Sequence, residues 1–178
     1  RIRQAIDSGE TIAVYGDYDT DGVAGAVLLT QALSSLGALV VPYIPHRLKE
    51  GYGLNCSAVD RLAGHAVGLI ITVDCGMNST NEIKHAQSLG IDVIITDHHS
   101  LPSSPPPAVA VINPRQDLGY PFRDLAGVGV AFKLVQGLFR DQSPNSCVEE
   151  DDFLDLVALG TVTDMAPLVG ENRYLVKR

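Results

Sequence analysis

Apolar and polar residues alternate along this chain in blocks that match short strands and helices. A β-branched run at 11–15 precedes a polar turn, and a long apolar-rich stretch at 22–36 ends before Gly37. This order predicts a strand, a turn and a helix. The unit recurs, with further strands expected at 39–44, 68–73 and 91–96 and further helices at 57–63 and 81–89. Such alternation predicts an α/β fold in which a parallel β-sheet carries helices on both faces, giving three layers.

The second half of the chain is less regular. It contains no internal repeat, and its proline-rich loop is too short to link two domains. We therefore expect residues 1–178 to form one domain. The predicted elements are a surface loop at 102–107, a buried strand at 109–112, a turn-rich connection at 113–125, helices at 127–139 and 153–159, a hydrophilic turn at 141–145 and the start of a helix at 172–178.

Composition narrows the class of protein. Of the 178 residues, 46% are hydrophobic, which is enough for one substantial core. No apolar run approaches the roughly 20 residues that cross a bilayer, and the first residues lack the apolar stretch of a signal peptide. A cytoplasmic protein is expected. Cys56, Cys75 and Cys147 are widely spaced and form no CxxC pair, which favours reduced thiols over a disulfide framework or a zinc knuckle.

The net charge of −8 argues against a protein that wraps nucleic acid with a generally basic surface, because such proteins gain affinity by neutralising phosphates. An anionic substrate would therefore need a local binding site. Carboxylates that hold divalent cations count as negative until the metal is included, so part of this acidity can itself be functional.

Acidic residues and histidines follow three of the predicted strands at the point where each strand ends. In an open parallel sheet, ligands bind beyond the carboxyl ends of the strands, so these side chains are expected to share one edge. Close carboxylates resist joint ionisation unless cations neutralise them. The residues are Asp17, Asp19 and Asp21 after the first strand, Asp74 after the third, and Asp97, His98 and His99 after the fourth.

Each group also has a simpler structural explanation. The aspartates after the first strand can form a turn and cap a helix, and Asp74-Cys75-Gly76 alone says little. Adjacent histidines at a buried strand end are less common, and joint occurrence at three strand ends favours a metal site. Carboxylates with some imidazole suit manganese or magnesium better than zinc. Two such ions would generate a hydroxide nucleophile for phosphoester cleavage.

The motifs Asp19-Thr20-Asp21-Gly22, Asp74-Cys75-Gly76 and Asp97-His98-His99 resemble the first three signature motifs of the DHH phosphoesterase superfamily. Further segments are similar to the bacterial RecJ branch, the single-strand-specific 5′-to-3′ DNA exonucleases, and the likeness covers nearly the whole chain. It implies a phosphodiesterase of DNA repair and recombination that uses two divalent metal ions, manganese in first place and magnesium as the alternative. The RecJ-like segments are 15–23, 42–47, 50–55, 127–134 and 160–165.

The resemblance also implies roles for individual residues. Asp74 would bridge two metals, and Asp164 would complete the ligand set as the fourth motif. His99 would face the scissile phosphate, while Asp97 would orient its neighbours. The implied metal ligands are Asp19, Asp21, Asp74, His98 and Asp164.

Two residues at or near the first motif, Asp17 and Tyr15, are not expected to bind metal. Asp17 is acidic and close, but we expect it to support the ligands rather than to bind metal. Tyr15 stands four residues before Asp19, where many members of the superfamily have a histidine ligand. One metal would therefore be held more weakly or be completed by water.

The loop after the second predicted strand is a candidate for substrate binding. His46 and Arg47 lie at the same predicted edge as the acidic cluster and can bind a substrate phosphate, or they are solvated loop residues. Tyr52 can stack on a base or pack the loop. The backbone amides at 127–129 precede a helix, and either hold an anion or mark close packing against the sheet.

The resemblance further implies single-stranded DNA as a partner, together with a single-strand-binding protein and a helicase. Members of the family carry a C-terminal substrate-binding domain, which these 178 residues lack, so the chain is interpreted as a DHH catalytic domain. Two alternatives stay open: cleavage of short oligonucleotides, cyclic dinucleotides or pyrophosphate, and a non-catalytic replication scaffold. The RecJ-like segments favour DNA over small substrates, and the four retained motifs favour an enzyme over a scaffold.

Overall fold

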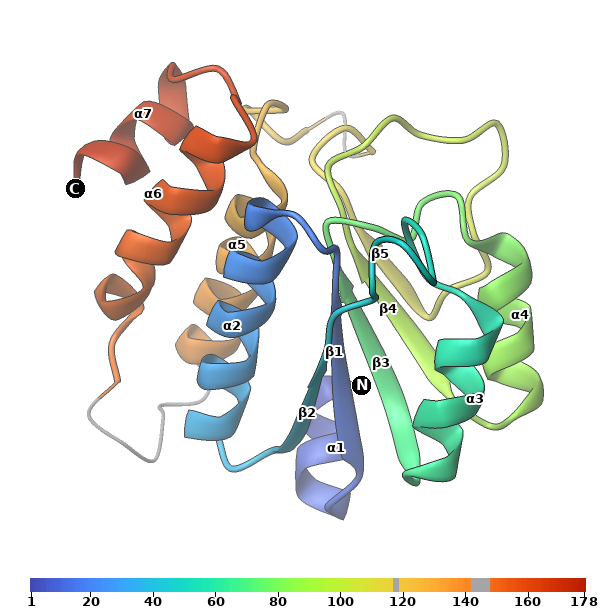
Figure 1. Ribbon diagram of the computed structural model, residues 1–178. Coiled ribbons are helices and arrows are strands. Elements are labelled where there is room, and N and C mark those ends of the chain that lie inside the picture. Colours follow the sequence, from blue (N-terminus) through green and yellow to red (C-terminus); the bar gives the residue numbers. More distant parts are fainter. Residues whose placement is uncertain (117–118, 142–147) are drawn as a thin grey trace.

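Five parallel strands form one sheet through the centre of the molecule, shown as a computed structural model in Figure 1. The structure describes residues 1–116, 119–141 and 148–178. The order across the sheet is β2-β1-β3-β4-β5, and each neighbouring pair is parallel. The strands are β1 (Thr11–Gly16), β2 (Leu39–Tyr43), β3 (Val67–Val73), β4 (Asp92–Thr96) and β5 (Ala110–Ile112).

Helices cover both faces of this sheet. On one side α1, α2 and α5 pack against the strands, α6 packs outside α2 and α5, and α7 packs on α6; on the other side α3 and α4 cover the sheet (Figure 1). A short 3-10 helix, η1 (Glu150–Phe153), leads into α6. The α-helices are α1 (Ile2–Ser8), α2 (Thr20–Ser35), α3 (Cys56–Gly64), α4 (Thr80–Ser88), α5 (Gly127–Asp141), α6 (Leu154–Thr163) and α7 (Gly170–Lys177).

One apolar core lies on each face of the sheet, because consecutive residues of a strand point to opposite sides. Val14 of β1 belongs to the core under α2 and α5, and the next residue, Tyr15, belongs to the core under α3 and α4. Both side chains are fully buried. Burial on two faces explains why the central strands are nearly continuous apolar runs. The predicted three-layer α/β fold is confirmed.

The structure also departs from the sequence-based predictions. Helix α1 was not predicted, because it has seven residues and buries only Ile2 and Ala5. The strand expected to be buried near residue 110 is instead the edge strand β5, in which Ala110 is exposed. Most of the predicted turn at 141–145, and Cys147 with it, lie outside the described residues.

Two further predictions concern cysteines and membranes. Cys56 and Cys75 are free thiols, as expected for these two residues. None of the helices among the described residues is long and apolar enough to cross a membrane.

Candidate metal centre

The hydrogen-bond ladder of the sheet continues one residue past three of its strands, and each of these residues is an aspartate. The Asp17 amide donates to the Val73 carbonyl at 3.2 Å, and the Asp74 amide to the Thr96 carbonyl at 3.0 Å. The Asp97 amide donates to the Ile112 carbonyl at 3.1 Å. The three aspartates therefore lie side by side at the carboxyl edge of the sheet, where open α/β folds bind ligands.

Helix α2 begins at this edge and adds two more carboxylates. Asp19 is its N-cap, and Asp19 Oδ1 accepts from the Gly22 amide at 2.9 Å. Capping is thus one of its functions, as the simpler interpretation of this motif expected. Asp21, in the first turn, is almost fully buried and points toward the start of α5.

The start of α5 holds the Asp21 side chain in place. The Gly127 amide donates to Asp21 Oδ2 at 2.6 Å, and the Val128 amide donates to Asp21 Oδ1 at 2.8 Å. The sequence left open whether these amides bind an anion or mark close packing. They bind an anion, but one that belongs to the protein itself, since the free amides of a helix N-terminus favour negative charge.

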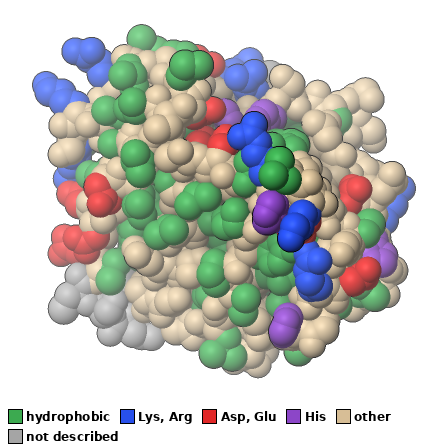
Figure 2. Space-filling model, viewed as in Figure 1, with side chains coloured by type: hydrophobic (Ala, Val, Ile, Leu, Met, Phe, Trp, Pro, Cys, Tyr) green, Lys and Arg blue, Asp and Glu red, His purple; other side chains and the backbone are tan. Residues whose placement is uncertain are grey.

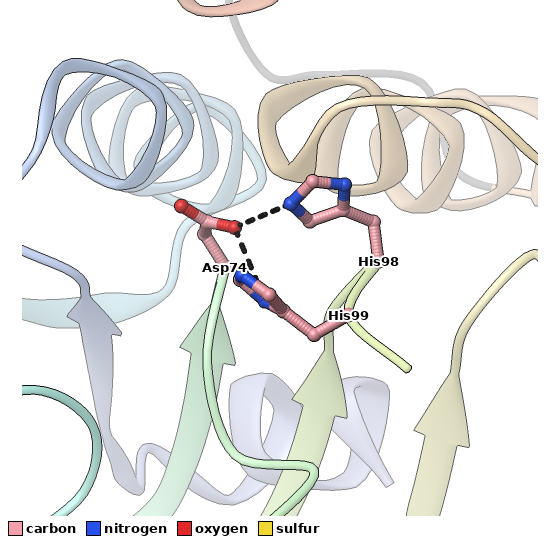
Figure 3. A group of neighbouring side chains, drawn as sticks. All are labelled: Asp74, His98 and His99. Carbon is pink, nitrogen blue, oxygen red and sulfur yellow. Dashed lines mark ion pairs between the residues drawn. The ribbon is translucent and has the colours of Figure 1, made fainter. Parts of the chain in front are cut away.

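Asp74, His98 and His99 meet above the ends of β3 and β4, with their side chains directed toward one another (Figure 3). His98 Nε2 lies 3.0 Å from Asp74 Oδ1, and His99 Nδ1 lies 3.8 Å from the same oxygen. Asp74 has a left-handed backbone with φ 62°, which is uncommon for a residue other than glycine. Strain of this kind concentrates at functional sites.

Asp97 has a different part in the arrangement, because its carboxylate is occupied by protein donors. Oδ1 accepts from the amides of His98 at 2.8 Å and His99 at 3.0 Å, and lies 2.7 Å from His99 Nδ1. Oδ2 accepts from the Met77 amide at 3.1 Å. Asp97 therefore fixes the backbone of the two histidines and the ring of His99.

The side chains at this edge form three overlapping groups that can each surround a cation. Within each group, potential ligand atoms lie within 4.8 Å of one another. Asp17 Oδ1 is buried with no hydrogen-bond partner in the described residues, and the buried atoms Asp74 Oδ1 and His98 Nε2 face each other as an ion pair at 3.0 Å without a well-directed hydrogen bond. Buried polar atoms left without partners are costly unless an ion or water satisfies them. The groups are Asp74–His98–His99, Asp21–His98–Asp164 and Asp17–Asp19–Asp74.

The electrostatics of the cluster agree with this geometry. Burial raises the pKa of Asp74 to about 7 and that of Asp21 to about 6, and the charge of a neighbouring carboxylate adds to both shifts. Burial by itself would lower the pKa of His98, but Asp74, Asp164 and Asp21 together raise it to about 9. The site thus favours positive charge at its centre, as a cation site must. The donor set of carboxylates and imidazole fits manganese or magnesium.

All five implied metal ligands are brought together in these groups, and two further residues join them. Asp17, expected only to support the ligands, groups with Asp19 and Asp74, and His99 groups with Asp74 and His98. Tyr15 does not join the cluster: its hydroxyl donates to the Gly53 carbonyl at 2.9 Å, on the α3 side of the sheet. The side chain at the position of the superfamily histidine thus points to a loop.

The structure separates the two predicted substrate residues. The Arg47 guanidinium lies over the Tyr18 ring, 5.2 Å from its centroid, beside the acidic loop. His46 instead belongs to a local turn, in which its amide donates to Glu50 Oε2 at 2.8 Å. It lines an open depression of about 690 Å³ together with Lys49 and Arg61. Figure 2 shows a band of His, Lys and Arg side chains on this face of the molecule.

Comparison with known proteins assigns the family. A model described as the DHH family, N-terminal domain, matches residues 11–161. This chain belongs to the DHH family. Among curated DHH relatives, it is 46% identical over 176 residues to the single-stranded-DNA-specific exonuclease RecJ of Bacillus subtilis (strain 168), which covers 98% of this chain and 22% of that protein. The chain therefore spans about a fifth of the length of that relative.

Solved structures with the same fold include proteins that bind divalent ions. A crystal structure of exonuclease RecJ bound to manganese matches with a TM-score of 0.88 and 40% identity, over 99% of this chain and 44% of that one. RecJ of Thermus thermophilus in complex with Mg²⁺ matches with a TM-score of 0.67 and 32% identity, over 99% of this chain and 21% of that one. Both of these RecJ proteins therefore bind divalent metal ions.

Sequence reasoning missed one contact at the centre of the site. The hydroxyl of Tyr52 lies 3.3 Å from His99 Nδ1 and 3.3 Å from the Asp74 carbonyl oxygen. The only sequence signal was the setting of Tyr52 between two glycines, which allows a sharp loop but does not say where the side chain points.

Proposed function

We propose that this DHH domain hydrolyses phosphodiester bonds of single-stranded DNA from the 5′ end, in DNA repair and recombination. The observation that carries the proposal is the cluster of carboxylates and imidazoles, in which Asp17 Oδ1 is buried without a hydrogen-bond partner in the described residues and Asp74 Oδ1 faces His98 Nε2 as a buried ion pair. Support for the substrate comes from the RecJ relatives, whose name specifies single-stranded DNA. A cytoplasmic location fits such a substrate.

Two divalent ions, manganese in first place and magnesium as the alternative, fit these groups. Asp74 belongs to two of the three groups, which suits a carboxylate that bridges two ions. When bound, such ions polarise a phosphoryl oxygen and lower the pKa of water to supply a hydroxide at neutral pH. The proposed ligands are Asp19, Asp21, Asp74, His98 and Asp164, with Asp17 as a further carboxylate in reach.

His99 is proposed to act on the substrate, and Asp97 is proposed to act on His99. The side chain of Asp97 raises the pKa of His99, because its carboxylate accepts from Nδ1. The raised pKa favours the protonated ring, in which Nδ1 donates to Asp97 and Nε2 would donate to a phosphate oxygen, where developing negative charge is stabilised. Asp97 keeps this ring in place and does not itself need to touch the substrate.

Arg47 is proposed to bind a phosphate of the DNA, since its guanidinium is held beside the acidic loop by Tyr18 and arginine pairs with phosphate in a bidentate manner. The depression that His46, Lys49 and Arg61 line would continue the path of the backbone. Arg47 and Lys49 would thus give an anionic substrate local positive charge in a chain whose net charge is −8, whereas Arg61 is paired with Glu50.

The rest of the enzyme is proposed to lie beyond this domain. The B. subtilis relative is much longer than the part that this chain covers, which supports residues 1–178 as the catalytic domain of a larger exonuclease. A separate substrate-binding domain, a single-strand-binding protein and a helicase are its proposed partners.

The test uses the protein as it naturally occurs, with Mn²⁺ or with EDTA. Mononucleotide release from 5′-phosphorylated single strands, but not from duplexes or cyclic dinucleotides, is expected. Cleavage of cyclic dinucleotides alone would favour the small-substrate alternative, and no Mn²⁺-dependent cleavage would favour the scaffold. Asp74→Ala should abolish activity, whereas the exposed Asp7→Ala, on α1 at the amino-terminal side of the sheet, should not change it.

A further inference from the structure

The hydroxyl of Tyr52 lies between the backbone carbonyl of Asp74 and the ring of His99. The Tyr52 side chain comes from the loop between β2 and α3, and its ring meets the His99 ring edge-on, with centroids 5.8 Å apart and an interplanar angle of 72°. The hydroxyl donates to the Asp74 carbonyl at 3.3 Å and lies 3.3 Å from His99 Nδ1. Both contacts involve residues that follow the ends of β3 and β4.

The hydrogens of these groups can be assigned by elimination. The carbonyl of Asp74 can only accept, so the Tyr52 hydroxyl hydrogen points to it. The ionised carboxylate of Asp97 can also only accept, so His99 Nδ1 carries a hydrogen that points to Asp97 Oδ1, 2.7 Å away. The Tyr52 oxygen is then left as a second acceptor for the same Nδ1 hydrogen. Asp97 and Tyr52 together keep this hydrogen on Nδ1 and fix the plane of the His99 ring.

The loop that carries Tyr52 is itself fastened to the core. The buried Tyr15 hydroxyl donates to the Gly53 carbonyl at 2.9 Å and accepts from Asn55 Nδ2 at 3.1 Å. Gly51 and Gly53, on either side of Tyr52, have φ of 76° and 81°, a region that other residues rarely adopt. The turn that directs Tyr52 toward His99 therefore depends on these two glycines and on the Tyr15 anchor.

We propose that Tyr52 is a positioning residue for His99, and that Tyr15 anchors the loop that carries Tyr52. This inference rests on the proposed function, in which His99 donates from Nε2 to the scissile phosphate. The hydroxyl of Tyr52 keeps Nε2 directed at the substrate.

Tyr52→Phe tests the hydroxyl, because it keeps the ring and removes only the two polar contacts. In the protein as it naturally occurs, kcat on single-stranded DNA should fall about tenfold, as expected for one lost positioning hydrogen bond. KM and the Mn²⁺ concentration for half-maximal activity should stay within about twofold of the wild-type values, since substrate and metal contacts remain. Tyr174→Phe, on the exposed face of α7, is the matched control and should leave all three unchanged.

A spectroscopic measurement tests the contact between the Tyr52 hydroxyl and His99 Nδ1 independently of activity. In protein labelled with nitrogen-15 at histidine, the His99 Nδ1 resonance should shift in Tyr52→Phe and stay unchanged in Tyr174→Phe. An unshifted Nδ1 resonance overturns the proposed contact whether or not the protein cleaves DNA. A shifted resonance with an unchanged kcat overturns the positioning role. If the wild-type protein lacks Mn²⁺-dependent cleavage, the proposed function fails, and the nitrogen-15 spectrum still tests the contact.

A second variant distinguishes the positioning of His99 from the alternative in which Tyr52 stacks on a base. Tyr52→Leu removes both ring and hydroxyl. If stacking is the main contribution, KM should rise for Tyr52→Leu while kcat of Tyr52→Phe equals that of wild type, and this pattern contradicts the positioning role. The positioning role instead predicts that both variants lower kcat to a similar extent.

Discussion

Gly127 lies directly against the side chain of Asp74: a Cβ added at Gly127 would be 2.6 Å from Asp74 Cβ and 2.7 Å from its Oδ1. The contact joins the start of α5 to the end of β3, and the same glycine donates its amide to Asp21. Two carboxylates of the metal centre are thus placed by one residue without a side chain.

Gly127→Ala should therefore damage the metal centre. The added methyl group must displace Asp74 or the start of α5, and such overpacking typically costs about 1–3 kcal/mol. We expect a lower free energy of unfolding and roughly a tenfold or greater loss of Mn²⁺ affinity, measured by denaturant unfolding and by Mn²⁺ titration. Gly137→Ala on the same helix meets no atom within 4 Å and should stabilise by up to about 1 kcal/mol. Equal effects of the two substitutions would contradict the contact.

Asp164→Asn should have opposite effects on the metal-free and the metal-bound protein. Burial and the nearby Asp19 raise the pKa of Asp164, so above the unfolded-state pKa its charge destabilises the metal-free fold. In EDTA at about pH 7 the melting temperature should rise, and the further increase that Mn²⁺ produces should shrink. Asp7→Asn removes the same charge from an exposed position on α1 and should leave the Mn²⁺ effect intact. A normal Mn²⁺ effect in Asp164→Asn would remove this residue from the ligand set.

Mn²⁺ binding should strengthen with pH across the range in which the buried carboxyl groups ionise. In the metal-free protein Asp21 has a pKa of about 6 and Asp74 a pKa of about 7, and a metal binds only the ionised form. Calorimetric titration should therefore show affinity rising from about pH 5 to about pH 8, with protons released on binding. A flat pH profile would contradict these shifts.

The stability of the metal-free protein should move in the opposite direction. The raised pKa of Asp74, about 7, means that its ionisation destabilises the fold as the pH rises from the unfolded value of 3.8. The raised pKa of His98, about 9, gives stability that is fully present below 6.5 and is lost as the pH rises through 9. Thermal unfolding in EDTA should thus show a lower melting temperature at about pH 9 than at about pH 6, a difference that Mn²⁺ should reduce.

Arg47→Ala should weaken DNA binding more than it weakens chemistry. Loss of one phosphate contact should raise KM, and the slope of log K against log salt should become shallower by about 1. Arg47→Lys should recover part of the salt dependence but not the full affinity, because lysine lacks the bidentate geometry. Lys84→Ala, an exposed residue of α4, is the control. An unchanged salt slope in Arg47→Ala would mean that Arg47 only packs on Tyr18.

The sequence by itself determined the order and type of most elements and the group of residues at the carboxyl edge. Strand and helix periods differ, and parallel strands must end at the same side, so Asp74 and His98 could be placed together without coordinates. Helix α1 was not predicted from the sequence, because two buried residues in seven leave almost no periodic signal. Asp164 was found through its motif, since its position at the end of α6 carries no periodic sign of a ligand.

Tertiary structure alone decided the contacts that depend on where distant segments meet. Asp21 is held by amides more than 100 positions away in the sequence, and Tyr52 reaches His99 across 47 positions. Tyr15, at a position where the family resemblance implies a histidine ligand in many members, is buried under α3 and α4, where Gly53 accepts its hydroxyl. Side-chain direction and loop docking follow from packing against the whole core, whereas strand period and polarity are local properties of the chain.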